Sequence, residues 1–225
     1  MTNKNIRIID GIPLVAHSIL QAKKSGLFEH IAVSSDSDEI LTIASDWGAD
    51  ILVRRPLELA TDSSAKIPAI RHCFLEAEKM SESTFETIVD LDATSPLRRT
   101  SDIKGAVQLL EEKNVSNVIT GCLSKHSPYF NVVELDEKGG VKLAKRLENP
   151  VVRRQDAPQC FDMNASIYVW TRESLLRSET SVFFNDTLLF VMPQERSVDV
   201  DSPLDFKFVE FLMKENENIC KNTDL

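Results

Sequence analysis

Hydrophobic and polar positions along the chain follow two periods in turn, one helical and one extended. Apolar residues three and four apart predict helices near 12–22, 40–47, 67–80 and 103–110, a short one near 174, and a last one from 203. Short apolar runs predict strands at 30–34, 51–53, 87–91, 117–122, 166–170 and 188–192. Helices that alternate with buried strands predict a mostly parallel α/β sheet.

Capping residues and turn signals mark several boundaries. Ser101 is the expected N-cap of its helix, and Ser202 with Pro203 opens the last one, whose apolar face we expect to be Leu204, Phe208, Phe211 and Leu212. Residues 125–164 differ from the rest, with short extended pieces, a Gly139-Gly140 turn and clustered arginines. This region predicts a small β-rich insertion within a single domain of residues 1–225.

Length and charge limit the class of protein. A chain of 225 residues suits one large domain with a sizeable core. Its formal net charge of −9 argues against a general nucleic-acid binder. No apolar run is long enough to cross a bilayer and no signal-peptide pattern occurs at Met1, so we expect no membrane association and a cytoplasmic location. The four cysteines form no Cys-x-x-Cys pair, and neither they nor the histidines have zinc-ligand spacing.

Two aspartates one residue apart, Asp199 and Asp201, are the strongest chemical signal. They lie in Arg196-Ser-Val-Asp-Val-Asp201, whose alternation is typical of a strand, and on a strand they would project side by side. Adjacent carboxylates repel unless a cation lies between them, and Mg²⁺ prefers oxygen ligands. The pair therefore predicts a metal site, or alternatively two solvated carboxylates on an exposed edge.

A second segment points to a phosphate-bearing substrate. The strand ending in Asp90-Leu-Asp92 runs into the polar turn Ala-Thr-Ser-Pro-Leu-Arg98, where open α/β sheets place ligand loops. Arginine matches phosphate in a bidentate way, and Arg55, Arg98 and Arg154 each adjoin a turn-rich polar segment. We expect this turn to lie beside the acidic pair, in a Mg²⁺-dependent enzyme. Phe183-Phe184 is either a buried pair, a subunit contact or an apolar wall of a ligand site.

Seven stretches together resemble the acylneuraminate cytidylyltransferase family, in the family's order and over nearly the whole chain. They are Lys4-Asn-Ile-Arg7, Ser34-Ser-Asp36, Arg55-Pro-Leu-Glu-Leu-Ala-Thr-Asp62, Thr94-Ser-Pro-Leu-Arg98, Arg154-Gln155, Asn164-Ala-Ser-Ile-Tyr168 and Ser197-Val-Asp-Val-Asp201. The resemblance implies a Rossmann-like three-layer α/β/α domain. It also implies a homodimer formed through a subdomain at about 125–187, and the reaction of CTP with a nonulosonic acid to give CMP-sugar and pyrophosphate with Mg²⁺.

The resemblance also implies roles for individual residues. Lys4, Asp199 and Asp201 take catalytic positions, and the two aspartates hold Mg²⁺. Nucleotide-binding positions fall on Asn5, Arg55, Asp62 and Ser64. Sugar-binding positions fall on Asp92, Thr94, Ser95, Arg154, Gln155, Asn164, Phe183 and Phe184.

Two departures from the family pattern keep alternatives open. Asp92 and Lys66 stand where sialic-acid enzymes of the family usually have a glutamine and a serine. Both variants resemble the branch that activates legionaminic-type sugars, so the expected substrate is a legionaminic-type or a sialic-type acid.

The second departure is that the family's first strand and phosphate-cradling loop are absent before Lys4, which predicts exposed edges on the neighbouring strands. Either the sequence given starts late, or the chain is an impaired homologue that folds and dimerises without binding CTP. A generic nucleotidyltransferase that uses another base is a third possibility.

Overall fold

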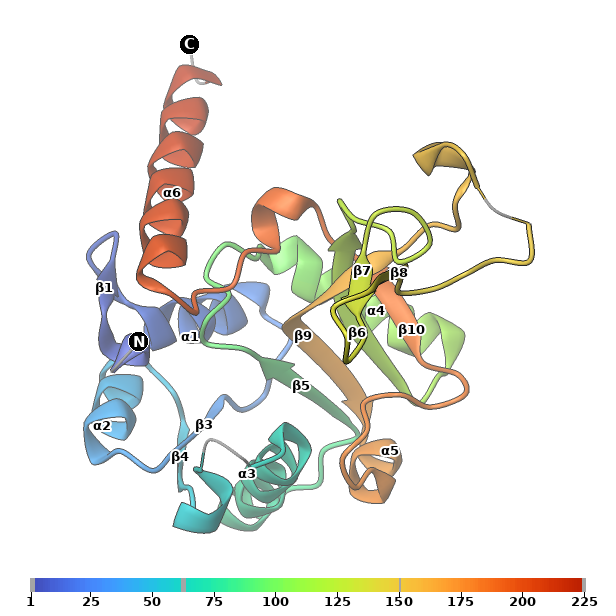
Figure 1. The fold of residues 1–225 in the computed structure, drawn as a ribbon. Coiled ribbons are helices and arrows are strands. Elements are labelled where there is room, and N and C mark those ends of the chain that lie inside the picture. The colour runs from blue at the N-terminus through green and yellow to red at the C-terminus, as the bar shows by residue number, and fades with distance from the viewer. Residues whose placement is uncertain (1–2, 62–63, 150, 224–225) are drawn as a thin grey trace.

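A four-stranded sheet in the order β10–β6–β9–β5 forms the middle of the molecule (Figure 1). The computed structural model describes residues 3–61, 64–149 and 151–223, with the side chains of 216–223 left aside. β9 runs antiparallel to both β5 and β6, and β10 runs parallel to β6, so three of the four strands share one direction. The strands are β5 (Thr87–Leu91), β6 (Asn117–Leu123), β9 (Phe161–Thr171) and β10 (Leu188–Val191).

Helices cover both faces of this sheet and of a separate parallel pair, β3 (Ala32–Ser35) and β4 (Ile51–Arg54). α4 packs on one face of the sheet and contacts α1, while α3 and α5 pack on the other. The three-layer α/β/α arrangement predicted for the chain is therefore confirmed. The helices are α1 (Leu14–Ser25), α2 (Asp38–Asp46), α3 (Lys66–Ser81), α4 (Thr100–Lys113), α5 (Arg172–Arg177) and α6 (Pro203–Thr223).

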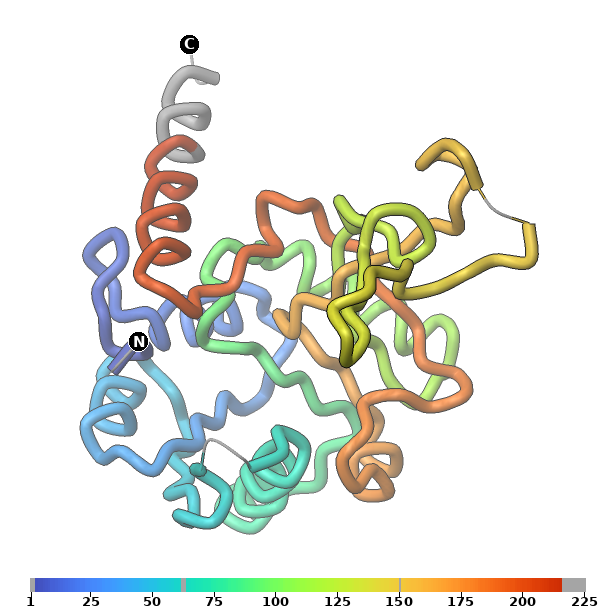
Figure 2. Tube along the Cα trace, in the orientation of Figure 1, coloured from blue at the N-terminus to red at the C-terminus, as the bar shows by residue number. Residues whose placement is uncertain are grey.

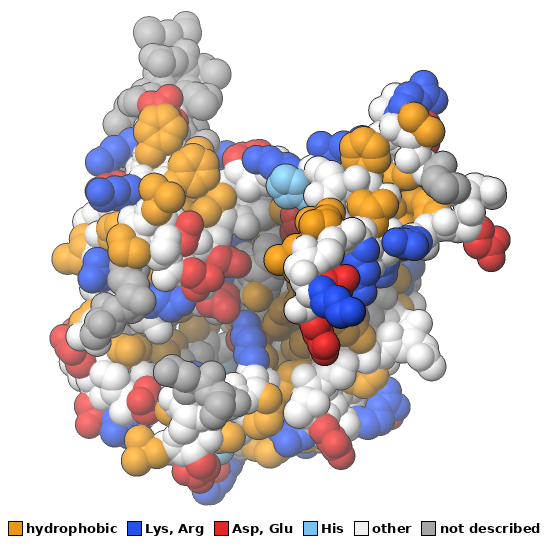
Figure 3. All heavy atoms as spheres, in the orientation of Figure 1, with side chains coloured by type: hydrophobic (Ala, Val, Ile, Leu, Met, Phe, Trp, Pro, Cys, Tyr) orange, Lys and Arg blue, Asp and Glu red, His pale blue; other side chains and the backbone are white. Residues whose placement is uncertain are grey.

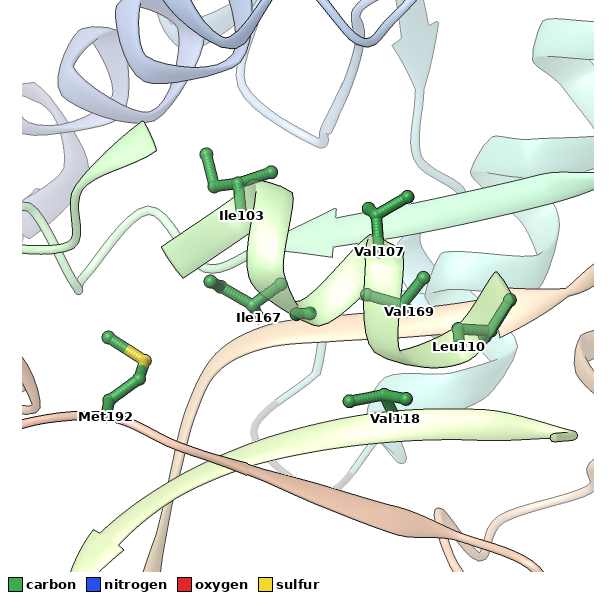
Figure 4. Packing of buried hydrophobic residues seen from close by; sticks show 8 residues of the cluster. Ile103, Val107, Leu110, Val118, Ile167, Val169 and Met192 are labelled. Atoms are coloured by element: carbon green, nitrogen blue, oxygen red, sulfur yellow. The ribbon is translucent and has the colours of Figure 1, made fainter. Parts of the chain in front are cut away.

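One cluster of the hydrophobic core lies where α4 crosses β6 and β9 (Figure 4). Ile103, Ala106, Val107 and Leu110 form the apolar face of α4, as their spacing predicts, and all four are buried. They pack on Val118, Ile167 and Val169 of the sheet. Val169 pairs with Val89 on one side and with Val118 on the other, so β9 is the central strand of this core.

A large cavity separates β3 from β5. Its volume is about 920 Å³, and its apolar walls come from both strands and from α1 and α3. Within the described residues, β3 pairs only with β4, and β5 pairs only with β9. Among the described strands, each of these two therefore presents an unpaired edge to the cavity.

The predicted β-rich insertion contains a hairpin, and the segment after it, which includes the 3₁₀ turn Arg154–Asp156, extends away from the body of the molecule (Figure 2). The hairpin contains β7 (Val133–Leu135) and β8 (Val141–Leu143), joined by a turn in which Gly139 has a φ of +80°. The β-rich stretch is predicted over 125–164 and the dimerisation subdomain to about 187, but the main sheet already resumes at Phe161 with β9. A second small hairpin joins β1 (Ile8–Ile9) to β2 (Ile12–Pro13) near the N-terminus.

The two predicted N-caps have different outcomes. Ser202 is an N-cap as predicted, since its Oγ accepts from the Asp205 N–H at 3.3 Å. Ser101 is not, because α4 already begins at Thr100 and the Arg99 N–H donates to Asp102 at 2.8 Å.

The buried face of α6 is also different from the prediction. Val209, with Phe206 and Leu212, packs inward, whereas Leu204, Phe208 and Phe211 remain exposed. Apolar residues occupy two stripes of this helix, so periodicity alone could not identify the buried one. None of the described helices has the length and apolar character needed to span a bilayer.

Candidate active site

The acidic pair lies in an extended segment that follows the 3₁₀ turn Gln194–Arg196. The predicted strand is wrong, because no described strand pairs along this segment, yet the predicted alternation holds. Val200 is fully buried, and its N–H donates to the Thr94 carbonyl at 2.9 Å. Asp199 and Asp201 flank it and both line the cavity. The pair therefore lies beside the Thr94-Ser95 turn, as expected.

The two carboxylates are in different environments. Asp199 Oδ1 accepts a hydrogen bond from Ser95 Oγ. Burial raises the pKa of Asp199 to about 6, although the bond from Ser95 opposes this, and the charges of Asp92 and Asp201 add to the rise. Asp201 is largely exposed and forms an ion pair with Lys4 Nζ at 3.0 Å. The two carboxylates therefore differ: the raised pKa of Asp199 lets it bind a proton more readily than a free aspartate does, whereas Asp201 is paired with Lys4.

Residues implied to bind the nucleotide line the same cavity. Arg55 follows β4 and donates to the Ser34 carbonyl at 2.7 Å and to Ser34 Oγ at 3.1 Å. Ser64 Oγ donates to the Glu58 carbonyl at 2.8 Å. The side-chain oxygen of Asn5 is buried without a hydrogen-bond partner in the described structure. Asp62 lies outside the described residues.

The cavity opens on the face seen in Figure 3, which is hollowed in its middle. Acidic side chains gather on one wall of the hollow, and basic ones lie beside them. Lys4, Asn5, Arg55 and Ser64 come together there with Asp199 and Asp201. Because β4 and β5 end at this edge, the arrangement matches the general position of ligands outside the carboxyl ends of strands.

Lys66 is a site residue that the sequence analysis noted only as a departure from the family. Its Nζ lies 2.9 Å from Asp90 Oδ2 and 3.0 Å from Asp92 Oδ2, and 4.8 Å from the centre of the Tyr168 ring. Burial opposes the charge of Lys66, but the two carboxylates outweigh it and raise the pKa of Lys66. The spacing that singled out Asp199 and Asp201 could also have marked Asp90 as the neighbour of Asp92, since in both pairs one residue separates the two aspartates.

Asp92 is held by the protein on both of its oxygens. Oδ1 accepts from the Thr94 N–H at 3.0 Å and from Thr94 Oγ1 at 2.8 Å, while Oδ2 accepts from Lys66. Burial works to raise the pKa of Asp92, but Lys66 and Thr94 more than compensate and lower it to about 2. Asp92 is therefore a charged anchor of the turn.

The remaining residues implied to bind the sugar lie in three places. Asn164 is buried close to the acidic segment, and its amide donates to Ser197 Oγ at 3.0 Å. Arg154 and Gln155 lie in the insertion, where Arg154 donates to the Ser124 carbonyl at 3.1 Å. Phe184 packs against Trp170 near the other end of β9, with ring centres 6.2 Å apart, and Phe183 is exposed. The structure does not place these last four on the cavity of the acidic pair.

Arg98, singled out for phosphate binding, is instead a structural residue. It is buried, and its guanidinium donates to Gln21 Oε1 at 2.7 Å, to the Asp92 carbonyl at 2.6 Å, and to Ser18 and Ser166. Burial lowers the pKa of Arg98 to about 10. The side chain joins α1, the turn after β5, and β9, and it does not line the cavity.

The chemistry of the acidic pair fits a hard divalent cation. Both residues offer carboxylate oxygens, and the described part of the chain gathers no group of three or more His, Cys, Asp or Glu suited to hold a metal. Mg²⁺ usually takes one or two protein carboxylates and completes its coordination with water and substrate phosphates. Two aspartates on the wall of this cavity, with Lys4 and Arg55 beside them, fit that pattern.

Comparison with known proteins identifies the family. The cytidylyltransferase family profile matches residues 1–212. The chain belongs to the cytidylyltransferase family. The resemblance found from its motifs is thereby confirmed, and the acidic pair, the Thr94-Ser95 turn and Arg55 all fall within the matched cytidylyltransferase region.

Similar cytidylyltransferases are known by sequence and by structure. A Campylobacter jejuni protein named CMP-N,N'-diacetyllegionaminic acid synthase is 46% identical over 211 residues, 94% of this chain and 88% of that protein. A Campylobacter coli protein named post-translational flagellin modification protein B is 44% identical over 220 residues, 98% of this chain and 92% of that protein. A solved CMP:2-keto-3-deoxy-manno-octonic acid synthetase, complexed with CTP, has a TM-score of 0.66 at 14% identity and covers 96% of this chain and 93% of its own. That last likeness supports the fold.

Proposed function

We propose that this cytidylyltransferase transfers CMP from CTP to a nine-carbon ulosonic acid of the legionaminic type, releasing pyrophosphate. The observation that carries the proposal is the meeting of Asp199 and Asp201 with the Thr94-Ser95 turn at the end of β5. The substrate class rests on the relative at 46% identity, which is named for CMP-N,N'-diacetyllegionaminic acid synthesis. A cytoplasmic location accords with CTP as the donor.

The residues of the site have distinct parts in this reaction. The anomeric hydroxyl of the sugar forms a bond to the α-phosphorus of CTP, the bond to pyrophosphate breaks in line, and the hydroxyl proton is released. Asp199 or Asp201, both on the cavity wall, would accept that proton directly or through a water. Lys4 and Arg55 carry positive charge on the cavity wall, where they would favour the triphosphate. Mg²⁺ held by Asp199 and Asp201 would neutralise charge that develops on the phosphoryl oxygens.

A panel of acceptors tests this proposal. Pyrophosphate release is measured with CTP, Mg²⁺ and N,N'-diacetyllegionaminic acid, N-acetylneuraminic acid or a 3-deoxy-octulosonic acid. The highest kcat/KM is expected with the legionaminic acid, and replacing CTP by UTP or ATP should reduce the rate. Greater turnover of N-acetylneuraminic acid would move the assignment to the sialic type. No release with any acceptor, together with no CTP binding by calorimetry, would favour the impaired homologue.

A homodimer is the second part of the proposal. Large apolar side chains are exposed on the insertion and next to it: Leu123, Phe130, Val133, Leu135, Val141, Val152, Phe161 and Met163. A hairpin as short as β7–β8 is marginal in water without a covering surface. A second copy is the occupant we propose, because it would also explain why Arg154 and Gln155 lie away from the cavity of their own chain.

A further inference from the structure

Lys66 lies at the N-terminus of α3, where a positively charged side chain is unfavourable unless an acidic partner is close. It is the first residue of α3, after Ala65 at the N-cap, and the first turn of this helix contains no acidic residue. A cation at a helix N-terminus is repelled by the helix dipole. Its two close carboxylates, Asp90 and Asp92, come from another element, β5 and the turn that follows. Lys66 therefore ties α3 to the end of β5.

A continuous series of hydrogen bonds leads from Lys66 to the acidic pair. Lys66 donates to Asp92 Oδ2 at 3.0 Å, and Asp92 Oδ1 accepts from the N–H and the hydroxyl of Thr94. The Thr94 carbonyl then accepts from the N–H of Val200, the residue between the two site aspartates. Ser95, next in the turn, donates to Asp199. Every link is a direct contact, so the position of the acidic segment depends on the turn. Arg98 holds the Asp92 carbonyl, while Lys66 through the Asp92 side chain holds Thr94.

We propose that Lys66 is a positioning residue that holds the Asp92–Ser95 turn, and through it Asp199 and Asp201, in the geometry for cytidylyl transfer. This role rests on the proposed function for the reaction it serves. Lys66 and Asp92 then act as one unit, with Asp90 as the second carboxylate beside the Lys66 ammonium.

Amide hydrogen exchange tests the positioning directly and needs neither metal nor substrate. In Lys66→Met, the amides of Thr94 and Val200 should exchange about tenfold faster or more, because the turn loses its anchor. The amides of Val118 and Val169 in the sheet report global opening and should not change. Lys66→Arg, which keeps the charge, should restore most of the protection. Lys79→Met, on the exposed far end of the same helix, is the matched control and should match the parent protein.

The dependence of CTP binding on Mg²⁺ separates positioning from simple electrostatics. Removing the lysine charge leaves the site more negative, so electrostatics alone predicts that less Mg²⁺ is needed. Positioning predicts the opposite, that the Mg²⁺ concentration for half-maximal CTP binding rises about tenfold in Lys66→Met. The change should be of similar size in Asp92→Asn, and the double variant should be little worse than either single one. Calorimetric titration of CTP at several Mg²⁺ concentrations gives these values.

The outcomes separate this inference from the proposed function. Unchanged exchange at Thr94 and Val200, or equal acceleration of the sheet amides, overturns the positioning role even if the parent protein is active. An unchanged or lowered Mg²⁺ requirement also overturns it. If the parent protein binds no CTP and activates no sugar, the proposed function is wrong, and the exchange comparison still decides the role of Lys66.

Discussion

At the scale of single residues, Asp199 and Asp201 share a segment but differ in what they contribute to the fold. Asp201 is 76% exposed in its side chain, and its partner Lys4 is also accessible to solvent. Exposed ion pairs contribute about 0 to 1 kcal/mol to stability. Asp199 is partly buried, and its raised pKa means that its ionised form is unfavourable in the fold. The two residues therefore allow separate tests of activity and of stability.

Asp201→Ala should remove activity and leave the fold intact. We expect the rate of pyrophosphate release to fall about 100-fold or more, because one of the two carboxylates proposed to hold Mg²⁺ beside the CTP phosphates is lost. The melting temperature should change by no more than about 2 °C. Glu195→Ala removes another exposed carboxylate a few residues earlier and serves as the control. Full activity in Asp201→Ala would disprove its assignment to the metal site.

Asp199→Asn should make the protein more stable at neutral pH while it loses activity. Between about pH 4 and pH 6 folded Asp199 keeps a proton that the unfolded chain has released, so stability falls as the pH rises through this window. Asparagine does not ionise and can still accept from Ser95. The variant should gain about 1 to 2 kcal/mol at pH 8, after allowance for solvent screening, and nothing near pH 4. Denaturant unfolding in EDTA at both pH values measures this, and an equal change at both would contradict the assigned pKa.

At the scale of elements, the helix and strand periods were sufficient to locate every major helix and most strands. β5 was predicted with its observed bounds, and α3 and α4 to within a few residues. The order of the strands was not predictable, because the insertion of β9 antiparallel between β5 and β6 depends on long-range pairing and leaves no local pattern. The burial of Arg98 was missed for a similar reason. Its acceptors are backbone carbonyls and side chains that are distant in sequence.

Arg98→Met should destabilise the protein, because Arg98 joins three elements. The change removes the hydrogen bonds of the guanidinium to the Asp92 and Ser166 carbonyls, which keep donors in Ser18 Oγ and the Asp92 N–H. It also removes the donor of Gln21 Oε1. Each lost bond to a charged donor contributes roughly 1.5 to 3 kcal/mol, and removal of a buried charge offsets part of the loss, so a net loss of about 2 to 4 kcal/mol is expected. Arg153→Met, in an exposed pair with Asp156, should cost less than about 1 kcal/mol. Urea unfolding of both variants gives the comparison, and equal losses would show that Arg98 is not a structural link.

At the scale of the whole molecule, the insertion with the hairpin β7–β8 and the cavity are separate features. In the proposed dimer, the insertion of one copy would lie at the cavity of the other. The cavity holds the acidic pair and the nucleotide-side residues. The insertion carries Arg154 and Gln155, away from that cavity, together with a group of exposed large apolar side chains that includes Leu135 and Val141. A chain with both features would complete its site only when a second copy supplies the insertion.

The proposed dimer can be broken at one pair of neighbouring side chains. Leu135 and Val141 are opposite one another in the hairpin and are 71% and 67% exposed. Leu135→Glu combined with Val141→Glu places two like charges on an apolar surface, so light scattering should show a monomer where the parent protein is a dimer. Sugar transfer should fall with dissociation, while CTP binding to the cavity should remain within about threefold. Leu57→Glu, equally exposed on the 3₁₀ turn Leu57–Leu59, should remain a dimer. A monomeric parent protein that transfers CMP at the full rate would show that each chain carries a complete site.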